Sequence, residues 1–364
     1  QAAREGLPVR LGVAATSAGS LTALRSKQRE IETRLGVAVP TETWPRSGTD
    51  AQAYRAALAT GRFNAAIIAA PDPMHHELAS AAVEAGLHTL LVKPFVTNLA
   101  DGVDLVRKAA GAGVYGAVEF HKRFDTANRL IRQRIESGSI GRPLVFHIEY
   151  SQRKIVPTEH FAAWSARTTI FQYLGVHYVD MVHFLTGALP LRAMATGQKA
   201  YLADRGLDTF DAMQVMVEWS MPGGHRFISN HLTHWVDPNT TSAMSDQKLQ
   251  VIGTEGRIDS DQKNRGLQVV TDAGGIEDVN PYFSQFVPAD DATEDFAGYG
   301  AESFKQFLID VAAIRAGRLK TADLATQRAT FASSLVSQAV LEAAQASLEA
   351  ENTWVPVDLS WRER

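Results

Sequence analysis

The sequence predicts an α/β protein of two domains, the first built on a doubly wound parallel sheet and the second on a large, open, mostly antiparallel sheet. A chain of 364 residues is long for a single core. Residues 64–93 show strand, helix and strand in succession, which is a βαβ unit. After residue 120, apolar residues alternate along longer strands, as in an antiparallel sheet with one open face. We place the domains at residues 1–122 and 123–364.

The first domain alternates short apolar strands with helices. Pro71 breaks the strand before it, and Gly86 fits the C-terminal cap of the helix that follows. The expected strands cover residues 9–15, 64–70, 87–92 and 114–120, and the expected helices cover 74–85 and 98–112. Strands joined through helices in this way form a doubly wound sheet.

The second domain opens with a helix and continues mainly as strands. The turn signal Met221-Pro-Gly-Gly224 separates two alternating strands. The acidic residues 287–299 are expected to form a mobile loop. We expect helices at 126–137, 302–316 and 322–349, and strands at 144–150, 212–218 and 225–235.

The composition is that of an ordinary globular protein, with 45% hydrophobic and 21% charged residues and a formal net charge of −4. There is no basic excess for nucleic acid and no apolar run long enough for a membrane span. The chain has no cysteine, which fits a cytoplasmic location and excludes thiolate chemistry. None of the eleven histidines has the spacing of metal ligands, so we expect no metal site.

Polar side chains follow three consecutive strands of the predicted parallel sheet. In such sheets, ligands bind outside the carboxyl ends of the strands. A lone lysine there is most simply a solvated loop residue, but three neighbouring polar clusters favour a ligand site. A lysine at this edge can stabilise negative charge that develops on a substrate oxygen. The residues are Pro71, Asp72 and His75, then Lys93 and Pro94, then Glu119, His121, Lys122 and Arg123.

A second group lies on the segment Tyr173-Leu-Gly-Val-His177-Tyr-Val-Asp180. If the segment is helical, Tyr173, His177 and Asp180 share one face. His177 is either a core histidine or a general acid/base, since its pKa lies near neutrality. Asp180 either orients the ring of His177 or is an exposed helix carboxylate.

These motifs resemble those of the Gfo/Idh/MocA oxidoreductases, which pair a Rossmann domain with an open-faced α/β domain. Ala69-Ala-Pro-Asp-Pro-Met-His75 is similar to the strand-end motif T-P-N-x-x-H, and Leu91-Val-Lys-Pro94 to E-K-P. Leu174-Gly-Val-His-Tyr-Val-Asp180 is similar to G-x-H-x-x-D. The resemblance covers nearly all of the chain.

Within that family, the details look most like the D-galacturonate reductase branch. The lysine motif lacks the glutamate there, and similar segments follow, namely Glu119-Phe-His-Lys-Arg-Phe-Asp125 and Tyr150-Ser-Gln-Arg-Lys154. Tyr173 stands where most of the family carries aspartate.

The resemblance implies hydride transfer between a nicotinamide cofactor and a carbon of a sugar. Lys93 would polarise the reacting oxygen, His177 would shuttle its proton, and Tyr173 would bind the substrate or assist the relay. The cofactor would be NAD or NADP, held along the strand ends. Its expected contacts are Thr16, Ser17, Ala70, Pro71, Asp72, His75, Lys93, Pro94 and His121.

One departure from the family is that no G-x-G-x-x-G occurs in the sequence. The spacing predicts that residues 9–15 form the second strand of the Rossmann sheet, so that the first strand and its phosphate loop lie outside this sequence or are absent. True absence should abolish tight cofactor binding, because the pyrophosphate would lose its helix N-terminus. The hydroxyls of Thr16 and Ser17, with Arg25 and Lys27 nearby, favour NADP weakly over NAD.

Cations at the strand ends indicate an acidic sugar, a uronate or a sulfonated sugar, since arginine binds carboxylates in a bidentate manner. A runner-up function is an NAD-dependent glycoside hydrolase that oxidises, eliminates and reduces in turn, and a third is a non-catalytic sugar or nucleotide sensor. The open sheet face suits a homodimer or homotetramer. The expected substrate ligands are Lys122, Arg123, Arg153, Lys154 and Asp180.

Overall fold

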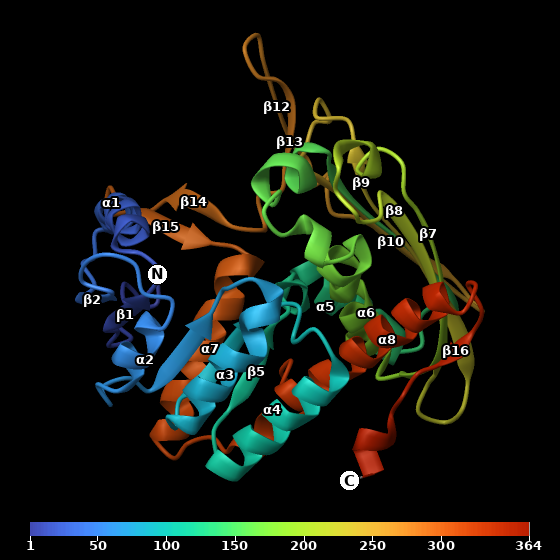
Figure 1. Cartoon of the computed structure of the whole chain (residues 1–364). Helices are drawn as coiled ribbons and strands as arrows, with labels where there is room; N and C mark the ends of the chain where they lie inside the picture. Colours follow the sequence, from blue (N-terminus) through green and yellow to red (C-terminus); the bar gives the residue numbers. More distant parts are fainter. Residues whose placement is uncertain (364) are drawn as a thin grey trace.

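The computed structural model describes residues 1–363 and has an α/β architecture with two sheet regions (Figure 1). The amino-terminal region contains two pieces of parallel sheet. One pairs β1 (Leu11–Ala14) with β2 (Thr41–Trp44), and the other has the order β3 (Ala65–Ile68), β4 (His88–Val92) and β5 (Gly116–Glu119). The predicted strands are confirmed, each slightly shorter than expected.

Within residues 1–363, no backbone ladder joins β1 to β3. Leu11 on β1 and Ile67 on β3 are exposed, although both lie on strands of a parallel region. In a doubly wound sheet of order 3-2-1-4-5-6, the strand next to β1 on that side would be the first one. The assignment of β1 as the second strand stays a prediction.

Four helices connect these strands: α1 (Ala18–Leu35), α2 (Ala53–Leu58), α3 (His75–Glu84) and α4 (Leu99–Ala112). Their ends follow the sequence signals. The side chain of Asn98 accepts a hydrogen bond from the backbone N–H of Asp101 at the start of α4, and Gly113 ends it with a φ of 66°. Ser17 caps α1 in the same way.

The second region is a seven-stranded mixed sheet in which only the β6–β9 pair is parallel. Buried and less buried residues alternate along β8 and β9, so one face carries the core and the other is open. In spatial order the strands are β11 (Arg257–Asp261), β10 (Ser245–Gly253), β6 (Pro143–Arg153), β9 (Arg226–Asp237), β8 (Ala212–Ser220), β7 (Leu189–Gln198) and β16 (Val355–Pro356).

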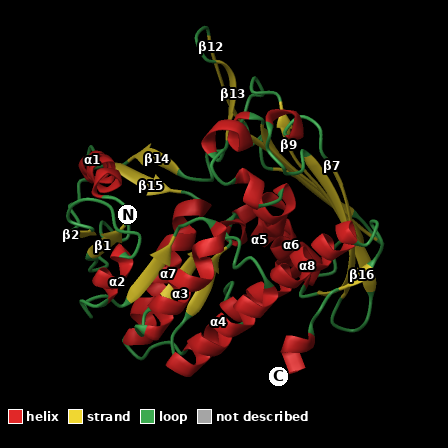
Figure 2. Ribbon diagram, in the orientation of Figure 1, coloured by secondary structure: helices red, strands yellow, loops and turns green. Residues whose placement is uncertain are grey.

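Helices cover one face of this sheet, as Figure 2 shows. Their apolar side chains join the largest core, in which Tyr178, Val215 and Val340 are fully buried. The covering helices are α5 (Thr126–Glu136), α6 (Val176–Thr186) and α8 (Phe331–Glu349).

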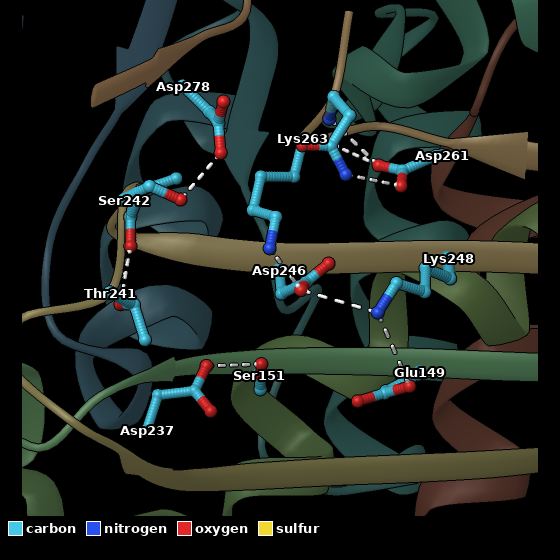
Figure 3. Close-up of polar contacts among 12 residues, drawn as sticks. Glu149, Ser151, Asp237, Thr241, Ser242, Asp246, Lys248, Asp261, Lys263 and Asp278 are labelled. Atoms are coloured by element: carbon cyan, nitrogen blue, oxygen red, sulfur yellow. Dashed lines mark hydrogen bonds and ion pairs between the residues drawn. The ribbon is translucent and has the colours of Figure 1, made fainter. Parts of the chain in front are cut away.

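Polar contacts link the ends of β6, β9 and β10 with the segments beside them (Figure 3). The Oγ of Ser151 donates to Asp237 over 2.5 Å. Asp246 lies between two ammonium groups, 2.7 Å from that of Lys263 and 3.3 Å from that of Lys248. These contacts add side-chain links to the backbone pairing of β6 with β9 and β10.

Two expectations for the carboxyl-terminal half were wrong. Residues 287–299 do not form a loop, because β14 (Gln285–Pro288) pairs with β15 (Glu294–Ala297). Glu294 of β15 forms an ion pair with Arg34 of α1, which ties this hairpin to the first region. The helix expected from residue 322 begins only at Phe331, after the short 3-10 helix η7 (Thr321–Leu324). A second hairpin, β12 (Leu267–Thr271) with β13 (Gly275–Val279), projects from the body.

Helix α7 (Tyr299–Arg315), which follows β15, packs on the first region. Phe307 and Val311 contact Leu90 and Ala117 on one face of β4 and β5. The backbone of β5 also bonds to the segment just before α8, where the N–H of Val118 donates to the carbonyl oxygen of Ala329 over 2.8 Å. The carboxyl-terminal helices therefore complete the core beneath the parallel strands, and the domain division at residue 122 stays a prediction.

Candidate active site

The carboxyl ends of β3, β4 and β5 lie at one edge, where the loops after β3 and β4 are joined by His75. Its Nδ1 lies 2.8 Å from the carbonyl oxygen of Pro94, and its Nε2 lies 2.9 Å from that of Ala70. The side chain is 1% exposed. Both ring nitrogens of His75 are therefore occupied by backbone carbonyls, and the residue holds together the loops after β3 and β4, the second of which carries Lys93.

Lys93 sits at the end of β4 as predicted, and its ammonium is held by Tyr173. The Nζ donates to the carbonyl oxygen of Tyr173 over 2.6 Å and lies 3.7 Å from the centroid of its ring. Burial lowers the pKa of Lys93 to about 8, although the carboxylates of Asp72 and Glu119 act in the opposite direction. A lysine with this pKa can both donate and accept a proton near neutral pH.

Asp72 belongs to the turn η1 (Asp72–Met74) after β3 and is 5% exposed. Its carboxylate receives long contacts from the Oγ of Thr168 and the Nε2 of Gln172, at 3.5 and 3.4 Å. Burial raises the pKa of Asp72, opposed by the charges of His75 and Lys93. This residue therefore links the strand ends to the segment before α6.

Tyr173 lies in a π-helical turn, η5 (Phe171–Gly175), which leads directly into α6. A side chain at position 175 would overlap the ring of Phe171, which explains why the residue just before α6 is glycine. The ring of Tyr173 is enclosed by aromatic neighbours, and burial raises its pKa to about 12. Those neighbours are Phe161, Trp164 and Trp235, at centroid distances of 5.3, 5.7 and 5.7 Å.

His177 is on the first turn of α6 and is 3% exposed. Its ring lies 4.8 Å from that of His121 and 6.1 Å from that of Tyr150, between centroids. Its Nδ1 has no hydrogen-bond partner within residues 1–363. Burial lowers the pKa of His177 well below its usual value, and the charges of Lys93, His121 and Lys122 lower it further.

Asp180 was expected to bind substrate, orient His177 or be exposed, but the structure gives it another partner. Its carboxylate accepts hydrogen bonds from Nε and Nη2 of Arg123, at 2.8 and 2.5 Å. Asp180 is 1% exposed. Because the two groups satisfy each other, neither Asp180 nor Arg123 is free for a ligand, and the pair fixes α6 to the turn after β5.

Lys122 points into the interior of the second region. Its ammonium donates to the side-chain oxygens of Gln247 and Gln262 and lies 5.0 Å from the ring centroid of Tyr150. Burial lowers its pKa to about 7, while Asp125 acts to raise it. Lys122 is therefore buried beneath the site and does not line its accessible surface.

The other predicted contacts are spread along the strand ends. The guanidinium of Arg153 is held by Thr241, and the Nζ of Lys154 lies 4.6 Å from the ring centroid of Tyr201. The four predicted cations therefore do not converge. Thr16 and Ser17 lie in the loop between β1 and α1, and Ala70, Pro71 and Pro94 are close to His75.

The contacts around Glu119 and His121 were not assigned from the sequence. Glu119, the last residue of β5, accepts a hydrogen bond from Ser303 of α7 and lies 3.0 Å from Nδ1 of His121. Phe283 and Tyr299 flank the ring of His121. The position of Glu119 two residues before His121 is a local signal, but Ser303 and Tyr299 come from distant segments.

No group of three or more possible metal ligands occurs in the part of the chain that the structure describes. A pocket of about 430 Å³ between α1 and β2 is lined by Arg25, Thr43 and Arg46, and lies away from Lys93.

None of the described helices is both long and apolar enough to cross a membrane.

Two family models match this chain. Residues 14–120 match the model described as an oxidoreductase family with an NAD-binding Rossmann fold, and residues 128–259 match the GFO/IDH/MocA C-terminal domain. Together the two matches span more than half of the sequence. The chain therefore belongs to the Gfo/Idh/MocA oxidoreductase family.

Among curated relatives, the 1,5-anhydro-D-fructose reductase of Ensifer adhaerens is 30% identical over 203 residues, which are 54% of this chain and 56% of that protein. The myo-inositol 2-dehydrogenase of Thermotoga maritima is 27% identical over 218 residues, 58% of this chain and 60% of that protein. The alignments thus span less than two thirds of these relatives. These names do not include the D-galacturonate reductase branch, so that finer placement stays a prediction.

Solved structures show the same fold. An inositol dehydrogenase homolog from Azotobacter vinelandii, complexed with NAD+, has a TM-score of 0.70 at 17% identity and covers 96% of this chain and 98% of its own. The scyllo-inositol dehydrogenase of Lactobacillus casei with NAD(H) and scyllo-inositol has a TM-score of 0.67 at 15% identity, covering 98% and 94%. The fold prediction is confirmed: a Rossmann domain of parallel strands and a domain with a large, mostly antiparallel sheet.

Proposed function

We propose that this protein is an NAD(P)-dependent oxidoreductase that transfers a hydride between a nicotinamide and a carbon of a sugar or cyclitol. The observation that carries the proposal is the placement of Lys93. Its ammonium lies at the carboxyl end of the parallel sheet with a pKa lowered to about 8, and its charge acts on the buried His177. The family and the substrates named for the two relatives point to the same chemistry.

The strand ends fit the nicotinamide end of such a cofactor. His75 fixes the loops that carry Ala70 and Pro94, and Lys93 stands at the edge between them. A bound nicotinamide would supply the hydride acceptor or donor. Ser17 and the first turn of α1 offer small residues for the adenosine end of NAD or NADP.

In this site, Lys93 would hold the reacting oxygen and carry its proton. As an ammonium, Lys93 donates a hydrogen bond that stabilises negative charge on a carbonyl oxygen. As a neutral amine, it accepts the proton of a hydroxyl group. His177 serves as the second proton carrier, and the ring of Tyr173 keeps the ammonium in place.

For the substrate, we propose a polyhydroxylated ring compound, and the acidic-sugar class is its finer form. The four cations that favoured an acid do not converge, and Arg123 is paired with Asp180. Lys93 remains near His177 at the strand ends, where its charge would favour a carboxylate. No contact of Tyr173 favours the glycoside hydrolase over simple hydride transfer. The open sheet face suits a homodimer or homotetramer.

The test is cofactor reduction with a panel of inositols, neutral aldoses, uronates and sulfonated sugars, using NAD+ and NADP+ in parallel. We expect turnover in wild type and a loss of about a hundredfold or more in kcat for Lys93→Met. Lys108→Met is the matched control, because Lys108 is a surface lysine paired with Glu84 and Asp104. Absence of cofactor-linked turnover with every panel member would defeat the proposal.

A further inference from the structure

The site contains two imidazoles side by side, and only one of them has a carboxylate partner. The rings of His121 and His177 lie 4.8 Å apart between centroids. Nδ1 of His121 lies 3.0 and 3.1 Å from the two carboxylate oxygens of Glu119. His177 has no such partner, since Asp180 is bound by Arg123 and the Nδ1 of His177 is unpaired among the described residues.

The carboxylate of Glu119 is buried and held in position by a hydrogen bond, as a group that orients an imidazole must be. It is 4% exposed, and the Oγ of Ser303 donates to it over 2.6 Å. Because a carboxylate accepts, the Nδ1 of His121 must carry the proton, which leaves its Nε2 as the nitrogen that gains or loses one. The ring of His121 is stacked on Tyr299 at 5.8 Å and packed against Phe283 at 5.4 Å.

His177 cannot return a proton to water alone. It is 3% exposed, whereas the side chain of His121 is 16% exposed, so His121 lies on the solvent side of the pair. Burial and the nearby charges disfavour the imidazolium of His177. The charged or titratable groups around the two rings are Lys93 from the end of β4, Glu119 from β5, Lys122 from η2 (His121–Phe124), Tyr150 from β6 and Tyr299 from α7.

We infer that Glu119 and His121 form a carboxylate–imidazole pair that passes protons between His177 and solvent during turnover. This inference rests on the proposed function. In the direction of oxidation, the proton of the substrate hydroxyl would reach His177, directly or through Lys93. His177 would pass it to Nε2 of His121, which would release it to water. A bound nicotinamide would accept the hydride that balances the reaction. Glu119 is a positioning residue, since it acts through His121.

The experiment compares Glu119→Gln and His121→Asn with a matched pair elsewhere. His76 and Asp104 form another imidazole–carboxylate contact, at 2.9 Å, between α3 and α4, so Asp104→Asn makes the same chemical change outside the site. We expect Glu119→Gln and His121→Asn to lower kcat roughly tenfold or more with KM changed less than about threefold. Their solvent deuterium isotope effects on kcat should rise, and Asp104→Asn should match wild type.

Two further variants separate a relay from a purely structural role. Added imidazole should restore turnover to His121→Gly, because the side chain that it replaces is partly exposed. Ser303→Ala removes one hydrogen bond to Glu119 but keeps the carboxylate beside His121, so kcat should fall less than in Glu119→Gln and the solvent isotope effect should stay near the wild-type value. Equal kcat losses in Ser303→Ala and Glu119→Gln, without a rise in the isotope effect, would overturn the relay.

A readout without activity uses ring-nitrogen NMR of the histidines in the cofactor-free protein. We expect the Nδ1 signal of His121 to shift in Glu119→Gln, because an amide oxygen is a weaker acceptor than a carboxylate, and to stay unchanged in Asp104→Asn. The Nδ1 signals of His75 and His183, which face backbone carbonyls, should not move. Unchanged histidine spectra in Glu119→Gln, or unchanged kcat in both site variants while Lys93→Met is inactive, would refute the inference. If wild type itself shows no cofactor-linked turnover, the proposed function fails, and the relay that depends on it falls too.

Discussion

The Nζ of Lys93 donates a hydrogen bond to the backbone carbonyl of Tyr173 over 2.6 Å and lies 3.7 Å from the centroid of the same residue's ring. One residue thus holds the ammonium through a main-chain oxygen and an aromatic face. Neither contact uses the phenol hydroxyl. The link joins the end of β4 to the entry of α6 across 80 residues of sequence, and it brings the lysine and histidine motifs into one site.

Tyr173→Phe should therefore keep most of the activity, because the carbonyl and the ring face both remain. We expect a kcat within about threefold of wild type, and a loss of more than about tenfold for Tyr173→Ala, which removes the cation–π contact. Steady-state kinetics of the two variants check this. A loss in Tyr173→Phe as large as in Tyr173→Ala would show instead that the hydroxyl takes part in proton transfer.

The lowered pKa of Lys93 predicts opposite pH profiles for the two directions of reaction. Oxidation of a hydroxyl needs the neutral amine, so kcat/KM should rise as pH increases through about 8. Reduction of a carbonyl needs the ammonium, so kcat/KM should fall over the same range. Lys93→Arg should remove the inflection in both profiles, since arginine stays charged. Profiles that are flat between pH 7 and 9 in wild type would contradict the assignment.

Lys122 makes a separate prediction for stability. Its pKa is lowered in the folded protein to about 7 from 10.5, so between these values the unfolded chain binds more protons than the folded one. The free energy of unfolding should therefore rise with pH over this range, and the cost of the buried charge is fully present below pH 7. In Lys122→Met, we expect this contribution, up to about 1.4 kcal/mol per pH unit, to disappear.

Denaturant titrations at several pH values measure that slope. Lys108→Met is the control, because Lys108 lies on the surface in ion pairs with Glu84 and Asp104. The same pH dependence in Lys122→Met and wild type would show that the charge of Lys122 is not desolvated as the structure indicates.

The pair of Arg123 and Asp180 should be worth more to stability than to substrate binding. Asp180→Asn leaves a buried guanidinium without its counter-charge and should lower the free energy of unfolding by about 3–5 kcal/mol. Arg132→Ala, which breaks a surface pair with Glu136, should cost about 0.5 kcal/mol or less. Chemical denaturation gives both values. A stable Asp180→Asn protein with a raised KM would return Asp180 to the substrate.

The local parts of the fold were accessible from the sequence because their signals are local. The strand and helix pattern of residues 64–120 gave β3, α3, β4, α4 and β5 within a few residues, since buried strands and capped helices leave short-range patterns. The start of α8 was misplaced because several residues from Ala322 onward are good helix formers. The helical structure is nevertheless interrupted between Leu324 and Phe331. The hairpin at 285–297 was missed because it is held by Arg34, far away in sequence.

By itself, the sequence determined which residues could meet at the strand ends, since Lys93, His75 and His177 stand in recognisable motifs at fixed spacings. Only the tertiary structure decided their partners. Asp180 is satisfied by Arg123 rather than by His177, Glu119 pairs with His121, and Lys122 is buried beneath the site. The physical reason is that spacing along a strand or helix specifies a face, whereas burial and charge pairing depend on segments that are distant in the chain.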